Sequence, residues 1–168
     1  MDRDIMQAIF SGDVEKFDAL TREHGVKPDA VVEPDQWNYL HRALVSVAQP
    51  ADARMVRHLI ERGVPVDARD RYGNTPLYYA AQAKNVAAMQ ALLDAGADVN
   101  TKNEEEVTPL RELLVRKPLN LEAVELLLSH GADMHQANPG GVSIKEYAKK
   151  ITQGDRKLLD LFEKYDHK

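Results

Sequence analysis

A block of 33 residues, Asp70 to Lys102, recurs along this chain and constrains its fold more than any other feature. Its apolar pairs return in steps of 33 and 35 residues, at Leu59-Ile60, Leu92-Leu93 and Leu127-Leu128. A glycine follows each pair at the same steps, at Gly63, Gly96 and Gly131. A period of this length is typical of stacked supersecondary units that share their apolar sides. It predicts an extended array with a binding surface and argues against a globule with one enclosed active site.

The best-defined block, residues 70–102, carries the signals of two helices. Thr75 is placed to cap the first helix, and Pro76 suits its first position, where a missing N–H costs nothing. The apolar residues of this helix share one narrow face, at Leu77, Ala80 and Ala81. The second helix is expected at 86–94, and Gly96 supplies its left-handed stop. Neither helix buries its stripe alone, so stacking against the neighbouring pairs is expected to close the core.

The order of residues in this block resembles the ankyrin repeat, on the motif Thr75-Pro76-Leu77-Tyr78-Tyr79-Ala80-Ala81 followed by Leu92-Leu93 and Gly96-Ala97-Asp98-Val99-Asn100. Thr108-Pro109-Leu110 repeats it, and His41 stands where the family usually has His. The resemblance implies one all-α domain, an ankyrin-repeat solenoid of stacked helix-turn-helix units with short turn or hairpin tips. Its implied units are an N-terminal cap repeat at 1–32, central repeats at 33–69, 70–102 and 103–137, and a C-terminal cap repeat at 138–168. The extra residues of the two longer repeats are expected between their paired helices, at 48–51 and 116–119.

Composition narrows the class of protein. The chain has 168 residues, is 43% hydrophobic and 29% charged, and has no run of 18 apolar residues, so a folded protein without a membrane span is expected. Its N-terminal stretch has acidic residues and no long apolar core, which argues against a secretory signal. The lack of cysteine excludes disulfides and thiol chemistry and fits a reducing compartment, so a cytoplasmic location is expected. The net charge of −5 argues against nucleic acid as the main partner.

In ankyrin proteins, partners usually contact the turn tips and the concave face of the first helices, so the resemblance implies a protein-binding surface there. By position, the tip residues are Asp35, Gln36, Trp37, Arg71, Tyr72, Asn74, Lys102, Glu104, Glu105 and Glu106. The first-helix residues are Val45, Ser46, Gln82, Val115 and Arg116. Trp37 and Tyr72 lie in successive tips, and exposed aromatic residues are favoured interface anchors. Trp37 has a second interpretation, in which its ring lies under the loop and replaces packing that its looser repeat lacks.

Three consecutive glutamates, at 104–106, concentrate negative charge in one tip. Residues 103–137 hold seven acidic and three basic residues, whereas residues 70–102 hold three of each. One hypothesis is that this tip binds a basic partner surface. The alternative is a solvated turn, which is what most charge runs are. Glu106 aligns with Gly73, so the same turn geometry would give Glu106 a positive φ at a cost of about 1 kcal/mol.

No catalytic pattern stands out, because the chain has no glycine-rich phosphate loop, no HExxH and no GxSxG motif. His130 and His135 flank Asp133, but a helix end and loop with one further ligand type is a poor metal site. We therefore expect no catalysis, no metal and no cofactor. The lysines of 138–168 lack interleaved aromatic residues and indicate a solvated capping face, not a nucleic-acid surface.

Two interpretations of the binding stay open. Some small stand-alone ankyrin proteins resemble bacterial immunity proteins or enzyme inhibitors, so one hypothesis is that the chain inhibits or sequesters a partner, such as a toxin or an enzyme with a basic surface. The alternative is a generic adaptor or scaffold subunit. A nucleic-acid-binding protein and an enzyme rank below both. The capped ends favour a monomer in the free state.

Overall fold

A computed structural model of the protein describes residues 2–27, 29–46, 51–152 and 156–166. Within these residues the chain forms short helices joined in pairs, as the repeated block predicts. Their bounds are α1 (Asp2–Ser11), α2 (Val14–Glu23), α3 (Tyr39–Leu44), α4 (Ala53–Glu61), α5 (Pro76–Gln82), α6 (Val86–Asp94), α7 (Pro109–Val115), α8 (Leu121–Ser129), α9 (Ile144–Thr152) and α10 (Arg156–Tyr165). Each pair lies inside one of the five units expected from the sequence.

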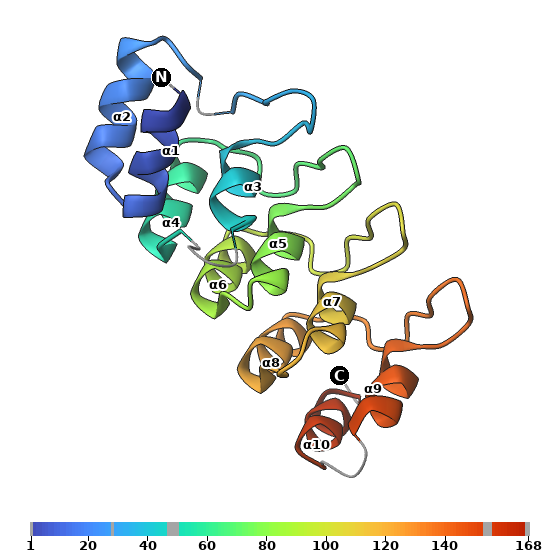
Figure 1. Ribbon diagram of the computed structural model, residues 1–168. Coiled ribbons are helices and arrows are strands. Elements are labelled where there is room, and N and C mark those ends of the chain that lie inside the picture. Colours follow the sequence, from blue (N-terminus) through green and yellow to red (C-terminus); the bar gives the residue numbers. More distant parts are fainter. Residues whose placement is uncertain (1, 28, 47–50, 153–155, 167–168) are drawn as a thin grey trace.

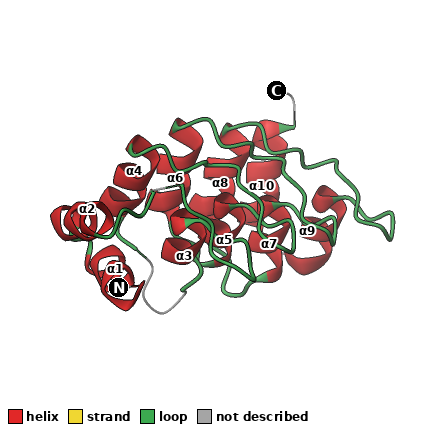
Figure 2. Cartoon of the chain, turned by 90° about the horizontal axis from the view of Figure 1, so that it is seen from above, coloured by secondary structure: helices red, strands yellow, loops and turns green. Residues whose placement is uncertain are grey.

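The helices are arranged in two rows. Seen from above, α4, α6, α8 and α10 form one row and α3, α5, α7 and α9 the other (Figure 2). Long loops leave the helices on one side and run beside one another (Figure 1). Among the described residues, β pairing consists of two isolated bridges, between Val32 and Trp37 and between Ala137 and Ser143. The prediction of an all-α stack of helix-turn-helix units is therefore confirmed.

Local sequence sets the start and end of the helices. Thr75 and Thr108 cap α5 and α7, each accepting a backbone N–H three residues on, and a proline follows each of them. At the other end, Gly96 lies at φ 86° after α6, and its N–H donates to Leu93 O at 3.0 Å. The next amide, from Ala97, donates to Leu92 O, so the last carbonyls of α6 are satisfied. Asn85 caps the start of α6, which begins and ends where the sequence predicts, at Val86 and Asp94.

The core runs continuously through the stack. Apolar side chains of successive helices are fully buried, including Leu40, Met55, Leu59, Leu77, Met89, Leu92, Leu110 and Leu127. Alanines at positions 80 and 81 are also fully buried, and their small size lets neighbouring helices approach closely. Each unit thus completes its burial with the next one, as expected for repeat architectures.

One of the two expected insertions lies within the described residues, between paired helices. Residues 116–119 lie between α7 and α8. Of the insertion expected at 48–51, residues 48–50 lie outside the described residues. Among the described residues, no helix has the length and apolar character that a membrane crossing requires.

Candidate functional site

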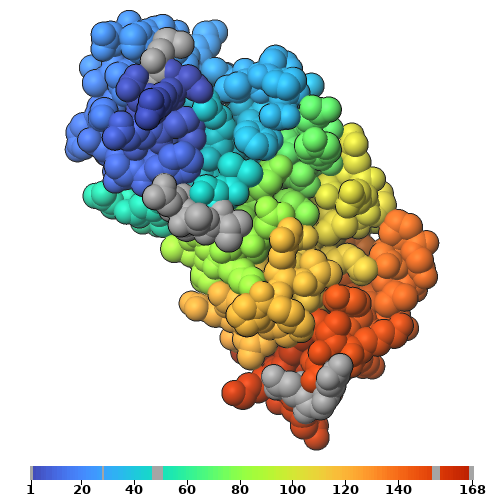
Figure 3. Space-filling view, viewed as in Figure 1, coloured from blue at the N-terminus to red at the C-terminus, as the bar shows by residue number. Residues whose placement is uncertain are grey.

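Four loop tips stand side by side along one edge of the molecule (Figure 1, Figure 3). We call them the first tip (residues 32–37), the second tip (70–74), the third tip (103–107) and the fourth tip (138–142). Backbone hydrogen bonds join the first three. The Arg71 N–H donates to Asp35 O at 3.0 Å, and the Glu104 N–H donates to Tyr72 O at 3.0 Å. These bonds fix the spacing between neighbouring tips without using any side chain.

Asp70 is the centre of a hydrogen-bond network beneath the first and second tips. One of its carboxylate oxygens accepts the backbone N–H groups of Tyr72 and Asn74, at 2.8 and 2.9 Å. The other accepts the Tyr79 hydroxyl at 2.6 Å and the Trp37 indole N–H at 3.3 Å. Asp70 is 4% exposed, so one buried carboxylate shapes its own turn and ties it to the first tip.

This network shifts the protonation of its members. Burial raises the pKa of Asp70, but the hydrogen bonds from Tyr79, Asn74 and Tyr72 outweigh it and hold that pKa below its ordinary value. Burial, together with the Asp70 carboxylate, raises the pKa of Tyr79. The network therefore contains a carboxylate and a neutral phenol at neutral pH.

His41 links the second and third helix pairs of the stack through the same region. Its Nε2 lies 3.1 Å from Asn74 O, which can only accept, so Nε2 carries the proton. Its Nδ1 accepts the Asn38 N–H at 3.3 Å. Burial lowers the pKa of His41, and the bond to Asn74 offsets this only partly, so the ring is neutral. His41 therefore hydrogen-bonds the turns of two neighbouring repeats.

The structure separates the predicted tip residues into buried and accessible ones. Trp37 fits the second of its two interpretations, in which the ring lies under the loop. The ring is half-buried, and its N–H donates to Asp70. It also lies edge-on to the Tyr79 ring, with the ring centroids 6.2 Å apart. Asn74 is 8% exposed, and its side chain accepts from Asn103 Nδ2 at 2.9 Å. The expectation that Asn74 lies at an accessible tip is therefore corrected, because its polar groups are used between turns.

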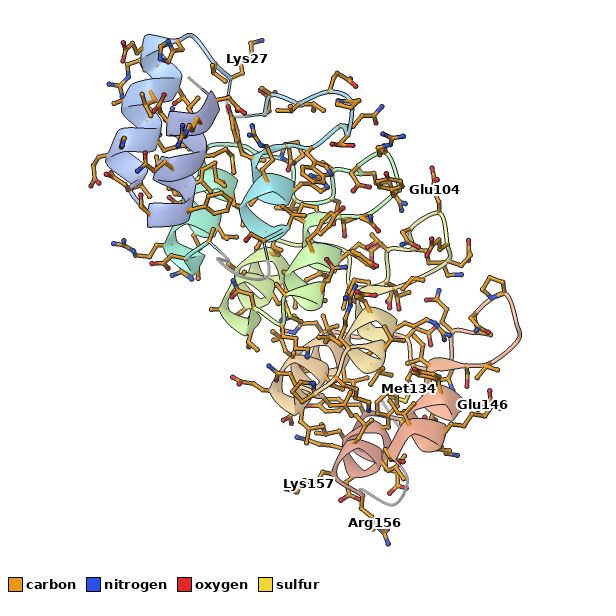
Figure 4. The ribbon with its side chains drawn as sticks, in the orientation of Figure 1. Lys27, Glu104, Met134, Glu146, Arg156 and Lys157 are labelled. Carbon is orange, nitrogen blue, oxygen red and sulfur yellow. The ribbon has the colours of Figure 1, made fainter. Side chains whose placement is uncertain are left out.

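Tyr72 and the glutamates are among the accessible residues of this surface, as are Gln36, Arg71 and Arg116. Tyr72 is 52% exposed, and the Arg71 guanidinium lies over its ring, 5.1 Å from the centroid. Arg71 also pairs with Asp35 across the first two tips, at 3.5 Å. Glu104 and Glu105 are exposed, and Figure 4 shows Glu104 extending outward from the tip between α6 and α7. The exposure predicted for Tyr72 is confirmed.

Two tip residues occupy strained backbone positions. Glu106 has φ 60°, as its alignment with Gly73 predicts, and Gln36, which aligns there too, has φ 58°. Lys102, just before the third tip, donates to Glu106 Oε2 at 2.6 Å and forms an exposed ion pair with it. The Lys102 ammonium is therefore already paired within its own loop. The Lys102 carbonyl also accepts a hydrogen bond from the Arg69 guanidinium at 2.7 Å.

Two of the predicted first-helix residues, Gln82 and Arg116, contact a buried carboxylate that the sequence pattern does not single out. Glu112 is 5% exposed and accepts from Gln82 Nε2 at 3.2 Å and from Arg116 Nε at 2.7 Å. Val115 is 44% exposed, whereas Val45 and Ser46 are partly buried. Burial, with the negative charge of Glu112, raises the pKa of the adjacent Tyr78. Tyr78 stands where the ankyrin family usually has His. This departure from the family motif was the one sign in the sequence that the surroundings of Tyr78, which include Glu112, are unusual.

The histidines near the C-terminal end serve other contacts. His130 Nδ1 bonds to Leu126 O at 2.9 Å, and His135 Nε2 lies 2.9 Å from Asp166 Oδ1. Across the described part of the chain, no group of three or more His, Cys, Asp or Glu side chains is placed to hold a metal ion.

Comparisons with known proteins agree with this architecture. A family model described as ankyrin repeats in three copies matches residues 5–103 and 55–138. A protein of Atelerix albiventris named "Ankyrin repeat, SAM and basic leucine zipper domain-containing protein 1" is 38% identical over 88 residues, which cover 51% of this chain and 18% of that protein. Its namesake in Equus caballus is 33% identical over 125 residues, or 62% of this chain and 26% of that protein. The chain spans about a quarter or less of these relatives.

Proposed function

The chain belongs to the ankyrin-repeat family of protein–protein interaction modules, and from this premise we propose that it binds a partner protein through its tips and the adjacent face of its first helices. We further propose that binding inhibits or sequesters that partner, for example a toxin or an enzyme with a basic surface. In this proposal the chain acts by occupancy, catalyses no reaction, contacts neither nucleic acid nor membrane, is a monomer when free, and works in the cytoplasm.

One observation supports the proposal most: the tips combine exposed, charged side chains with buried side chains that are hydrogen-bonded. Tyr72, Glu104 and Glu105 are accessible, while Asp70 and Asn74, in the same tip as Tyr72, are buried and hydrogen-bonded. A surface held in one conformation before binding loses little conformational entropy on binding. The tips therefore offer contact groups without a large ordering cost, which suits a module whose task is recognition.

The acidity of the third tip supports a basic partner. Residues 103–137 hold seven acidic and three basic residues, and the three glutamates of the tip are all exposed. Opposite charges across an interface speed association and discriminate among partners more than they raise affinity. We therefore expect association with the partner to slow as ionic strength rises.

A scaffold role is the second candidate function, and the comparisons give it a specific basis. The printed names of the relatives combine ankyrin repeats with SAM and basic leucine zipper domains, and the matched region is 18% to 26% of their length. In those proteins the repeats are one module among several. By analogy, the same array would bridge a partner to other modules and leave its activity unchanged.

Capture from a lysate of the source cells, with matched variants, tests the proposal. Tyr72→Ala combined with Glu104→Gln and Glu105→Gln should lose the partner, whereas Arg57→Ala with Glu61→Ala, on the exposed side of α4, should retain it. The activity of the captured partner is then measured free and bound. Equal capture by both variants would place the interface elsewhere, and a bound partner with unchanged activity would favour the scaffold role.

A further inference from the structure

A small pocket opens between the second and third tips. It has a volume of about 180 Å³ and is lined by Tyr72, Asn74, Tyr78, Asn103, Glu104 and Glu105. Pockets for drug-sized ligands are larger, roughly 300–1,000 Å³. The size therefore suits one inserted side chain of a partner better than a free metabolite or cofactor.

The negative charge of the pocket lining comes from Glu104 and Glu105. Glu106 is paired with Lys102, and Glu112 is paired with Arg116. For the Glu104 and Glu105 carboxylates, by contrast, the described residues provide no hydrogen-bond or ion-pair partner. Two free carboxylates at the rim of a partly enclosed site attract a cation, and a charge-assisted hydrogen bond to a carboxylate is stronger than a neutral one.

The walls of the pocket are aromatic. Tyr72 and Tyr78 both line it, and a tyrosine ring attracts a cation placed over its face. The chain already shows this contact, because the Arg71 guanidinium lies 5.1 Å from the centre of the Tyr72 ring. A guanidinium group is flat, stacks on rings and reaches a carboxylate through two parallel donors, whereas an ammonium group is a compact charge. The combination of ring and carboxylate favours arginine over lysine.

The pocket is formed before anything enters it. Its two sides are joined by the bond from the Glu104 N–H to Tyr72 O and by the bond from Asn103 Nδ2 to the Asn74 side-chain oxygen. Asn103 also holds its own turn, because its side-chain oxygen accepts the N–H groups of Glu105 and Val107, at 3.0 and 2.9 Å. The carboxylates are therefore presented from a fixed backbone.

We propose that this pocket receives a single arginine side chain of the partner protein, with the guanidinium against the tyrosine rings and its N–H groups directed to Glu104 and Glu105. The inference rests on the proposed function, and it specifies which partner group reaches this part of the surface. The arginine inserts between two tips, so it also sets the register of the partner along the array.

NMR titration of the intact, isotope-labelled chain tests the pocket without any partner. The probes are N-acetyl-arginine amide, N-acetyl-lysine amide and N-acetyl-citrulline amide, the last being an uncharged analogue of nearly the same shape. We expect saturable shifts at the amides of Tyr72, Asn103 and Glu105 with arginine in the millimolar range. Lysine should bind more weakly, and citrulline should leave these amides unmoved.

Matched variants test whether the carboxylates of Glu104 and Glu105 bind the arginine probe. Glu104→Gln with Glu105→Gln should weaken arginine binding by about fivefold or more, because both rim carboxylates are lost. Glu122→Gln with Glu163→Gln changes the net charge equally at exposed positions on α8 and α10 and should bind as the wild type does. Tyr72→Leu should weaken binding about threefold. Every substituted residue except Tyr72 is an exposed glutamate, and unchanged spectra elsewhere confirm that each variant is folded.

Several results would overturn the inference: no saturable shift at the pocket with arginine, equal binding of citrulline, equal or tighter binding of lysine, or undiminished binding by the Glu104→Gln, Glu105→Gln variant. None of these would by itself contradict partner binding, which the capture experiment decides separately. If partner capture depends on Tyr72 but the pocket does not bind N-acetyl-arginine amide, the proposed function stands and this inference fails.

Discussion

The junctions among the first three tips and the junction between the third and fourth tips are built differently. The second and third tips each donate a backbone N–H to the tip before them, from Arg71 and from Glu104. The residue at the same place in the fourth tip is Pro139, which has no N–H to donate. Within the described residues, no hydrogen bond joins the fourth tip to the third.

Side chains reinforce this difference. Trp37 reaches Asp70 across the first junction, and Asn103 reaches Asn74 across the second. In the third tip, the position of Asn74 is occupied by Val107, which has no polar side-chain atom to accept such a bond. Repeats built from the same pair of helices therefore differ in how firmly their tips are joined. The proposed arginine pocket lies at a joined junction.

The largest effect is expected from Asp70→Ala. The substitution removes an acceptor of two backbone and three side-chain donors, and it leaves the Tyr79 hydroxyl without its bond to Asp70. Buried donors without partners are costly, so the free energy of unfolding should fall by about 2–4 kcal/mol. Urea denaturation followed by circular dichroism measures it. Asp160→Ala, at an exposed position on α10, is the control; a loss at Asp70 no larger than at Asp160 would contradict the network.

The next largest effect on the free energy of unfolding is expected from one of two asparagines at equivalent places in their tips. Asn103→Ala removes two turn bonds and the link to Asn74, whereas Asn138→Ala removes one turn bond, from the Val142 N–H. We expect losses in unfolding free energy of about 1–2 kcal/mol for Asn103→Ala and under about 1 kcal/mol for Asn138→Ala. The same denaturation assay applies. Equal losses would mean that the second junction is no firmer than the third.

Hydrogen exchange tests the junctions without any substitution. The amides of Arg71 and Glu104 donate across tips and should exchange at least about tenfold more slowly than the amide of Gly140, which lies in the fourth tip. Two-dimensional NMR after transfer to deuterated water resolves the individual amides. Fast exchange at Arg71 and Glu104 would show that the cross-tip bonds open readily in solution.

The smallest effect concerns backbone strain in the third tip. Glu106→Gly should raise the free energy of unfolding by about 0.5 kcal/mol, because relief of the positive φ exceeds the loss of the exposed pair with Lys102. Glu105→Gly should instead lower it, since Glu105 is not among the positive-φ residues and glycine only adds freedom to the unfolded chain. Thermal melts of both variants provide the measurement, and a destabilised Glu106→Gly would mean that the ion pair outweighs the strain.

The sequence was most informative where a single residue determines local geometry. The cap at Thr75, the proline after it and Gly96 bracket their helices at the predicted residues, and the alignment of Glu106 with Gly73 gave the sign of its φ. Gln36 aligns at the same place and was not singled out, because its repeat departs more from the motif.

The surface was harder to predict, because it depends on how neighbouring tips meet. Asn74 occupies a tip in the sequence but is buried in the stack, where Asn103 and His41 bond to it. The pairing of Glu112 with Gln82 joins two repeats 30 residues apart and has no signature within either one. Such contacts arise from the register between units, which the pattern of one unit does not contain.

The unit at 70–102 is compatible with copies of itself. It gives a hydrogen bond to its predecessor through Arg71 and takes one from its successor through Tyr72, so both of its edges match. A second copy inserted directly after the first would meet the same donor and acceptor on either side. The array can therefore be lengthened in its interior at this unit, whereas a copy of the unit that carries Pro139 could not give this hydrogen bond to the tip before it, because proline has no N–H.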